Sequence, residues 1–129
     1  MEPVPPQLRR LTKRSQFLKA ARGNRAGRSA FGLQVAPVAA PEPGVGFTVT
    51  KKTGISPERN RIKRRLRAAA AACARDFRAG HDYVLVGRRE ALAEPFNKLV
   101  ADLGALIGRV HQPRSSSERP PAGRGPRKP

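Results

Sequence analysis

The sequence contains little of what a secreted, metal-binding or catalytic protein of its size needs. Its 129 residues include one cysteine, two histidines and nine Asp or Glu. The single cysteine, Cys73, excludes an internal disulfide and fits a reducing compartment, and so few possible ligands leave no structural zinc site. No apolar run approaches the roughly 18 residues of a membrane span, and residues 1–11 lack the apolar segment of a signal peptide. We therefore expect a cytoplasmic protein without a membrane partner.

Residues that commonly perform hydrolysis are also scarce. His81 and His111 have no nucleophile near them in the sequence, and the acidic residues form no DxD or ExxxD cluster of the kind that holds paired metal ions. We therefore expect no catalytic residue and no metal site in the protein itself.

Positive charge is what the sequence has in excess. It carries 27 Lys and Arg, for a net charge of +18, and hydrophobic residues make up 38%, enough for a folded core. The excess lies in three blocks, residues 1–28, 51–80 and 111–129, separated by segments that are nearly neutral. Blocks of this kind predict a basic face on a folded body, so the expected partner is a polyanion.

Composition divides the chain into three parts. Residues 1–7 contain three prolines and are expected to be a flexible segment, and 8–110 carry the hydrophobic periods of one folded domain. Residues 111–129 are rich in Pro, Gly, Ser and Arg without a hydrophobic period, which predicts a disordered basic tail.

Hydrophobic periodicity predicts six elements in the order α-β-β-α-β-α. In chain order they are a helix over 15–21, strands over 31–35 and 45–49, a helix that starts at Pro57 after an N-cap at Ser56 and ends at Gly80, a strand over 83–86 and a helix over 96–110. The loop between the first two strands is too short for a helical crossover, so antiparallel pairing of these strands is expected. The fold class is therefore α+β, a two-layer sandwich of three helices against a small mixed sheet.

Apolar stripes run along the two longer helices. One contains Ile62, Leu66, Cys73 and Phe77, which makes Cys73 a small buried hydrophobe. The other contains Phe96, Leu99, Val100, Leu103, Leu106, Ile107 and Val110. Both stripes are typical of core positions.

The remaining surface of the first of these helices is densely cationic. From Arg59 to Arg67 the sequence reads RNRIKRRLR, and at 100° per residue Arg61, Arg64 and Arg65 point away from the apolar stripe. Arginine engages phosphate oxygens in pairs, and the helix N-terminus adds partial positive charge. Glu58 is the only acid between residues 51 and 75, so these cations repel one another unless a partner neutralises them. This pattern predicts a nucleic-acid-binding face.

The run GFTVTKKTGISPERNRIKRRLR, residues 46–67, resembles the signature of the bacterial ribonuclease P protein subunit, in which a strand ending in two lysines precedes a helix that opens with an RNR motif. The resemblance extends to LRRLTKRSQF (8–17), to DYVLVGRR (82–89) and to the last helix. It implies a ribosomal-protein-like fold with a left-handed βαβ crossover, although the general rule favours right-handed crossovers.

The resemblance also implies a function and a set of contacts. The protein would bind the RNA subunit of ribonuclease P and the 5′ leader of precursor tRNA, would not bind DNA, and would assist an RNA that carries the active site and holds the required Mg²⁺. By position, the RNA-binding residues are Arg59, Asn60, Arg61, Lys63, Arg64, Arg65 and Arg67. The residues of a leader-binding cleft are Phe17, Phe31, Thr48, Thr50, Lys51 and Lys52. The sequence departs from the family at Ala21 and Gln34, where aromatic residues are common, and at Gly54–Ile55, where the loop usually has Gly-Asn.

Two other functions share the basic composition. A ribosomal or other structural RNA-binding protein would bind RNA without promoting cleavage of precursor tRNA. A metal-dependent nuclease would cleave its substrate without any added RNA.

Overall fold

The computed structural model describes residues 8–111; the segments 1–7 and 112–129, for which flexibility and disorder were expected, lie outside the described residues. The elements are β1 (Arg9–Arg10), α1 (Arg14–Ala21), β2 (Asn24–Gly27), β3 (Phe31–Pro37), β4 (Gly44–Thr48), α2 (Ser56–Ala72), β5 (His81–Gly87) and α3 (Phe96–Val110), with 3₁₀ turns at Lys51–Thr53 (η1), Ala74–Asp76 (η2) and Arg89–Leu92 (η3). The α+β class and the order of the six predicted elements are confirmed, and β1 and β2 are additional short strands.

The strands form one mixed sheet in the order β1-β4-β5-β3-β2. The expected antiparallel pairing of β3 with β4 is wrong, because β5 lies between them. It runs antiparallel to β3, from Phe31 opposite Gly87 to Pro37 opposite His81, and parallel to β4. The physical reason is burial: β5 is apolar on both faces, and a central position gives it a neighbour on each side.

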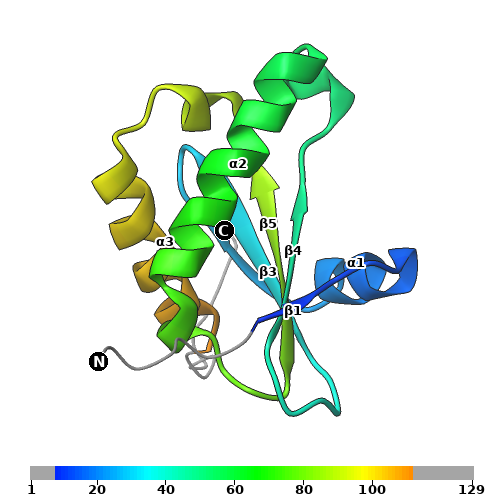
Figure 1. The fold of residues 1–129 in the computed structure, drawn as a ribbon. Coiled ribbons are helices and arrows are strands. Elements are labelled where there is room, and N and C mark those ends of the chain that lie inside the picture. The colour runs from blue at the N-terminus through cyan, green and yellow to red at the C-terminus, as the bar shows by residue number, and fades with distance from the viewer. Residues whose placement is uncertain (1–7, 112–129) are drawn as a thin grey trace, which may run out of the picture.

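The connection from β4 through α2 to β5 joins two adjacent parallel strands. In Figure 1, α2 lies in front of the sheet, both strands point upward, and the chain passes from β4 on the right to β5 on its left. This crossover is left-handed, the rare hand for a βαβ unit, as the family resemblance implied.

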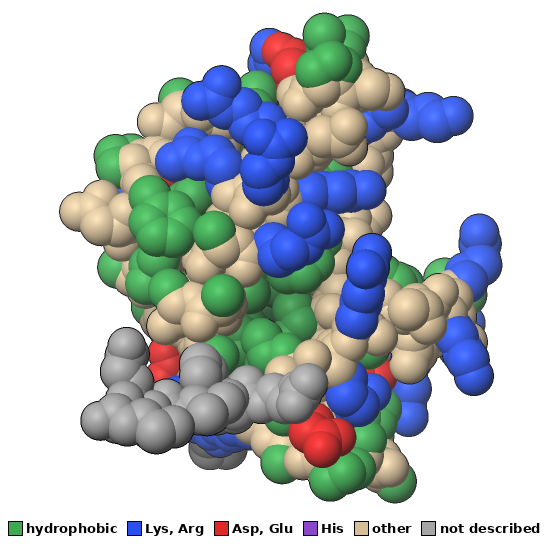
Figure 2. All heavy atoms as spheres, in the orientation of Figure 1, with side chains coloured by type: hydrophobic (Ala, Val, Ile, Leu, Met, Phe, Trp, Pro, Cys, Tyr) green, Lys and Arg blue, Asp and Glu red, His purple; other side chains and the backbone are tan. Residues whose placement is uncertain are grey.

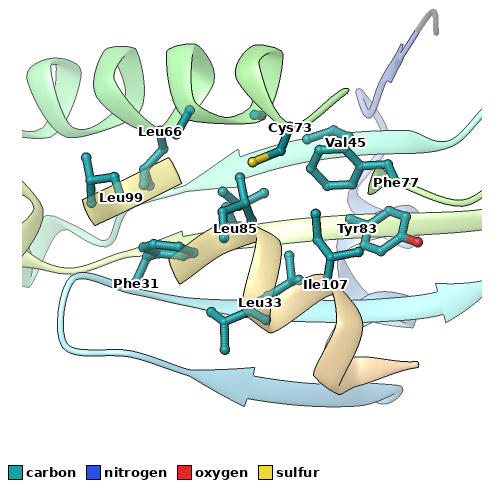
Figure 3. Close-up of a cluster of buried hydrophobic side chains, with 14 of the residues drawn as sticks. Phe31, Leu33, Val45, Leu66, Cys73, Phe77, Tyr83, Leu85, Leu99 and Ile107 are labelled. Carbon is teal, nitrogen blue, oxygen red and sulfur yellow. The ribbon is translucent and has the colours of Figure 1, made fainter. Parts of the chain in front are cut away.

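Alternation along β5 divides the apolar residues between two faces of the sheet. Tyr83 and Leu85 belong to the main core beneath α2 and α3, as Figure 3 shows, whereas Val84 packs with Leu11 and Ala20 on the other face, under α1. The main core also contains Cys73, as predicted, and burial raises the pKa of its thiol. Thus α1 and the pair α2–α3 cover opposite faces of the sheet.

Both ends of α2 differ from the prediction. Ser56 is the first helical residue rather than the N-cap, and Glu58, at the third helical position, accepts a hydrogen bond from the Ile55 N–H at 3.0 Å. At the other end the helix stops at Ala72 rather than at Gly80. The tighter η2 turn then brings Phe77 edge-on to Tyr83, with ring centroids 4.9 Å apart.

Helix α3 has the predicted bounds and packs its stripe into the main core, with one exception. The first residue of the stripe, Phe96, which begins the helix, is 44% exposed. Within residues 8–111, no helix has the length and apolar character that crossing a lipid bilayer requires.

His111 ties the end of α3 to the sheet. Its Nε2 lies 2.5 Å from the Tyr83 hydroxyl, and its ring meets that of His81 edge-on at 4.5 Å. Burial, together with the charges of Arg78 and His81, lowers the pKa of His111 from 6.5 to about 4. This first residue of the expected tail is therefore an uncharged part of the folded domain at neutral pH.

Acidification is expected to destabilise the protein through His111. Between pH 6.5 and 4 the unfolded chain binds a proton at this residue that the folded protein excludes, so stability rises with pH across this window. Measured by thermal unfolding, the advantage of the wild type over His111→Gln should shrink as pH falls from 7 to 4.5. A constant difference between the two melting curves over that range would contradict the assignment.

Candidate nucleic-acid interface

The exposed surface of α2 carries a set of cations that no acidic group of the described chain neutralises. Ile62 and Leu66 are fully buried beneath the helix. On the rest of its surface, Lys63 is partly buried and three residues are exposed: Arg61, Arg64 and Arg67. We call these four residues the α2 basic surface, and Figure 2 shows Lys and Arg side chains gathered over this helix. Within residues 8–111, the side chains of Arg61, Lys63 and Arg64 form no ion pair or hydrogen bond. Asn60 is exposed beside them in the first turn.

The one acid near this surface has another partner. The Arg89 guanidinium donates to both carboxylate oxygens of Glu58, at 3.0 and 2.9 Å. This pair lowers the pKa of Glu58 and raises that of Arg89, and the Ile55 N–H lowers the pKa of Glu58 further. Glu58 thus fixes the start of α2 against the β5–α3 connection and leaves the α2 basic surface unneutralised.

Two of the arginines expected to face RNA also make hydrogen bonds within the protein. Arg65 donates to the carbonyl oxygens of Ala91, Leu92 and Glu94 at 2.6, 3.1 and 2.5 Å, and its side chain is partly buried. Arg65 therefore differs from Arg61 and Arg64, which the rotation of the helix had grouped with it, in being partly buried and bonded to the protein; its contact with RNA stays a prediction. Arg59 reaches back to the Gly54 carbonyl and the Ser56 hydroxyl, at 3.1 and 2.9 Å.

The contacts of Arg65 predict a structural role for this residue. Arg65→Ala would leave three carbonyl groups around the η3 turn without their charged donor, so we expect the free energy of unfolding to fall by about 1.5–3 kcal/mol. The neighbouring Arg64→Ala, which removes an exposed and unpaired cation, serves as the control and should not change it measurably. Chemical denaturation of both variants makes the comparison. Equal stability of the two proteins would refute the role.

A cleft of about 550 Å³ lies between α1 and the sheet. We call it the α1 cleft; its walls are Arg14, Phe17, Leu18, Ala21, Gln34, Phe47, Thr48, Val84 and Val86. Of the residues expected in a leader-binding cleft, Phe17 and Thr48 line it. Ala21 and Gln34, the two departures from the family pattern, also face it, so the cleft holds one fewer ring on α1 and an amide on β3.

The other expected cleft residues lie elsewhere. Phe31 is fully buried in the main core, because alternation along β3 turns it with Leu33 toward α2 and α3 and turns Gln34 toward α1. The assignment of Phe31 to the cleft is therefore wrong. The sequence could have excluded it, because Phe31 and Gln34 lie three residues apart on one strand and must face opposite sides of the sheet. Thr50 hydrogen-bonds to Thr53 at 3.2 Å, and Lys51 and Lys52 are exposed in the η1 turn beyond the end of β4.

No metal site is evident in the described chain. Within residues 8–111, no three His, Cys, Asp or Glu side chains converge as ligands of a metal ion. Buried Asp82 is paired with Arg9, and Lys98 bridges Glu94 and Asp102, pairings that raise the pKa of the lysine. The acidic groups in these pairs therefore serve the fold.

The sequence matches the protein-family model Ribonuclease P over residues 6–111. It is 44% identical over 109 residues to the ribonuclease P protein component of Ruegeria pomeroyi, covering 81% of this chain and 87% of that protein. The corresponding protein of Brucella suis is 38% identical over 123 residues, covering 88% of this chain and 87% of the relative.

Solved structures show the same fold. The RNase P protein from Thermotoga maritima superposes with a TM-score of 0.69 at 23% identity, covering 80% of this chain and 98% of that one. The RNase P protein of Staphylococcus aureus superposes with a TM-score of 0.67 at 19% identity, covering 79% and 94% of the two chains.

Proposed function

The chain belongs to the ribonuclease P protein family, and from this premise we propose that it binds the RNA subunit of ribonuclease P and assists removal of the 5′ leader from precursor tRNA. The α2 basic surface is the proposed contact with the RNA subunit. The α1 cleft is the proposed contact with the leader. A cytoplasmic location belongs to the same proposal.

The observation that carries the proposal is that, within residues 8–111, no acidic side chain pairs with any cation of the α2 basic surface. Arg61, Lys63 and Arg64 are spread over the part of α2 that does not pack into the core, and Glu58, the one acid of this helix, is paired with Arg89. Phosphate groups of a folded RNA would neutralise these cations, and release of counterions would drive the association. Arg59 and Arg65 support this surface by fixing two neighbouring segments, the loop at Gly54 before α2 and the η3 turn. Arg59 lies in the first turn of α2, next to Asn60, and stays a proposed RNA contact.

Leader binding rests on the chemistry of the α1 cleft. Phe17 offers a ring face on which an unpaired base can stack, and Arg14 lies at the same wall. An aromatic platform beside cations holds single strands without strong sequence preference. Thr50, Lys51 and Lys52 remain proposed contacts of the strand where it leaves the cleft.

Hydrolysis itself is assigned to the RNA. The described chain offers no cluster of ligands for Mg²⁺, whereas RNA phosphates supply the oxygen ligands that this ion prefers. The protein's part is to hold the two RNAs together and to lower the repulsion between their backbones.

One reconstitution tests the proposal against its alternatives. Precursor tRNA is incubated with protein alone, with ribonuclease P RNA alone and with both, at low millimolar Mg²⁺. We expect rapid leader removal only with both components. Cleavage by the protein alone would indicate a nuclease, and binding without stimulation would indicate a structural RNA-binding protein.

A further inference from the structure

A second hollow, of about 350 Å³, lies on the other side of β4 from the α1 cleft. We call it the β4-edge groove; its walls are Leu8, Arg9, Arg10, Leu11, Phe17, Val45, Gly46, Phe47, Lys63, Arg67, Ala70 and Ala71. Figure 2 shows an apolar floor between Lys and Arg side chains on this face of the molecule. Its volume lies within the range of small-ligand pockets, about 300–1,000 Å³.

The groove combines an apolar floor with cations at its rim. Ala70 and Ala71 follow the basic run of α2, and their short side chains leave the half-buried Phe47 accessible beside the buried Val45. The Arg67 guanidinium lies over the Phe47 ring, 5.7 Å from its centre, within the range of a cation–π contact. Of the rim cations, Arg9 is already bound to Asp82, which leaves Arg10, Lys63 and Arg67.

The main chain of β4 adds polar groups to this floor. Strand β1 pairs only with Gly44 and Val45, and the Leu11 N–H donates to the Val45 carbonyl at 3.1 Å. Because alternate residues of a strand direct their N–H and C=O groups to the same side, those of Phe47 point to the same edge, where no strand of the described chain covers them. One donor and one acceptor thus stand beside an apolar floor, which suits the polar edge of a base.

We propose that the β4-edge groove holds one unpaired nucleotide of the ribonuclease P RNA. The base lies on the Val45–Phe47 floor, its edge bonds to the main chain of Phe47, and its flanking phosphates pair with Lys63 and Arg67. This inference rests on the proposed function and gives two members of the α2 basic surface a task distinct from that of Arg61 and Arg64.

The RNA subunit, rather than the leader, is the proposed source because of where the groove opens. Lys63 and Arg67 belong both to the groove and to the helix that carries Arg61 and Arg64, so one bound RNA can cover all four. The α1 cleft lies across the sheet from α2, beyond Phe17, whose ring sits over Gly46 and separates the two hollows.

The test fills the groove without removing a charge. Ala71→Leu places three more carbons in the groove at an exposed helical position, and Ala68→Leu makes the same change at an exposed position of α2 that does not line it. We expect the first variant to bind ribonuclease P RNA about ten-fold more weakly than the wild type, the loss of one stacked base, and the second to match the wild type. A filter-binding titration at one salt concentration measures both.

A second measurement asks whether a base is recognised. Uridine 5′-monophosphate should shift the amide resonances of Gly46, Phe47 and Ala71 in the wild type, and less so in Ala71→Leu, whereas ribose 5-phosphate should not. Equal effects of the two probes, or equal RNA affinity of the two leucine variants, would overturn the groove proposal and leave the reconstitution result untouched. A loss by Ala71→Leu confined to leader-bearing precursor tRNA, in the assembled holoenzyme, would overturn the assignment to the RNA subunit. Wild-type protein that fails to bind ribonuclease P RNA would instead contradict the proposed function.

Discussion

Replacing Arg61 and Arg64 together with glutamine is expected to weaken binding of ribonuclease P RNA by about 100-fold or more. Each arginine is exposed, is free of internal partners within residues 8–111 and can donate two charged hydrogen bonds to a phosphate. At roughly 1.5 kcal/mol or more for each lost charged contact, two losses multiply to this size. Filter binding at about 150 mM monovalent salt measures the effect.

Salt dependence gives the same prediction an independent measure. The four cations of the α2 basic surface would contribute about −3 to −4 to the slope of log K against log salt, at 0.7–0.9 for each neutralised phosphate. The double variant should reduce the magnitude of the measured slope by about 1.5. A slope that does not change would show that neither arginine meets a phosphate.

A control with the same loss of charge separates contact from bulk attraction. Arg75 and Arg109 are exposed, have no internal partner within residues 8–111 and lie outside the α2 basic surface. Replacing this pair with glutamine lowers the net charge equally, but should change RNA affinity only a few-fold. Equal losses in the two double variants would mean that charge acts from a distance, and the α2 basic surface would lose its assigned role.

Replacing Phe17, whose ring lines both the α1 cleft and the β4-edge groove, is expected to affect binding of the leader more than binding of the RNA subunit. Phe17→Leu keeps an apolar side chain beside Gly46 but removes the ring face from the α1 cleft. The assembled ribonucleoprotein should then bind leader-bearing precursor tRNA about 5- to 100-fold more weakly, while its affinity for mature tRNA stays the same. The ratio of the two affinities is the quantity to measure.

A second variant and a control keep this result interpretable. A methyl group at Gly46 would lie within 2.8 Å of the Phe17 ring, so Gly46→Ala should displace the ring and lower the same ratio. Phe96→Leu removes an aromatic ring that is exposed on α3, away from both hollows, and should leave the ratio unchanged. Loss of mature-tRNA affinity in Phe17→Leu would point to the RNA subunit as the partner of this ring.

Local periodicity was sufficient to predict the main helices and strands and the α2 basic surface. The apolar stripe of α2 placed Ile62 and Leu66 in the core, and the same 100° rotation placed Arg61 and Arg64 outside. Arg65 differs because its acceptors lie 26 to 29 residues away in a turn that no period describes. The cleft was predicted less well. Phe31 was assigned to it, but Phe31 and Gln34 lie three residues apart on β3 and therefore on opposite faces of the sheet, and it is Gln34 that lines the cleft.

The sequence by itself determined the α+β class, the bounds of α3, the identity of the basic helix and, through its motif, the family. Those features depend on residues close together in the chain, where propensity, period and charge act directly. The tertiary structure alone decided the strand order, the separation of the sheet into two covered faces, the hydrogen bonds from Arg65 to the carbonyls of the η3 turn, and the two hollows on either side of Phe17. Each of these depends on segments that are distant in the sequence and become neighbours only when β5 lies between β3 and β4. Local propensity and periodicity do not specify such long-range contacts.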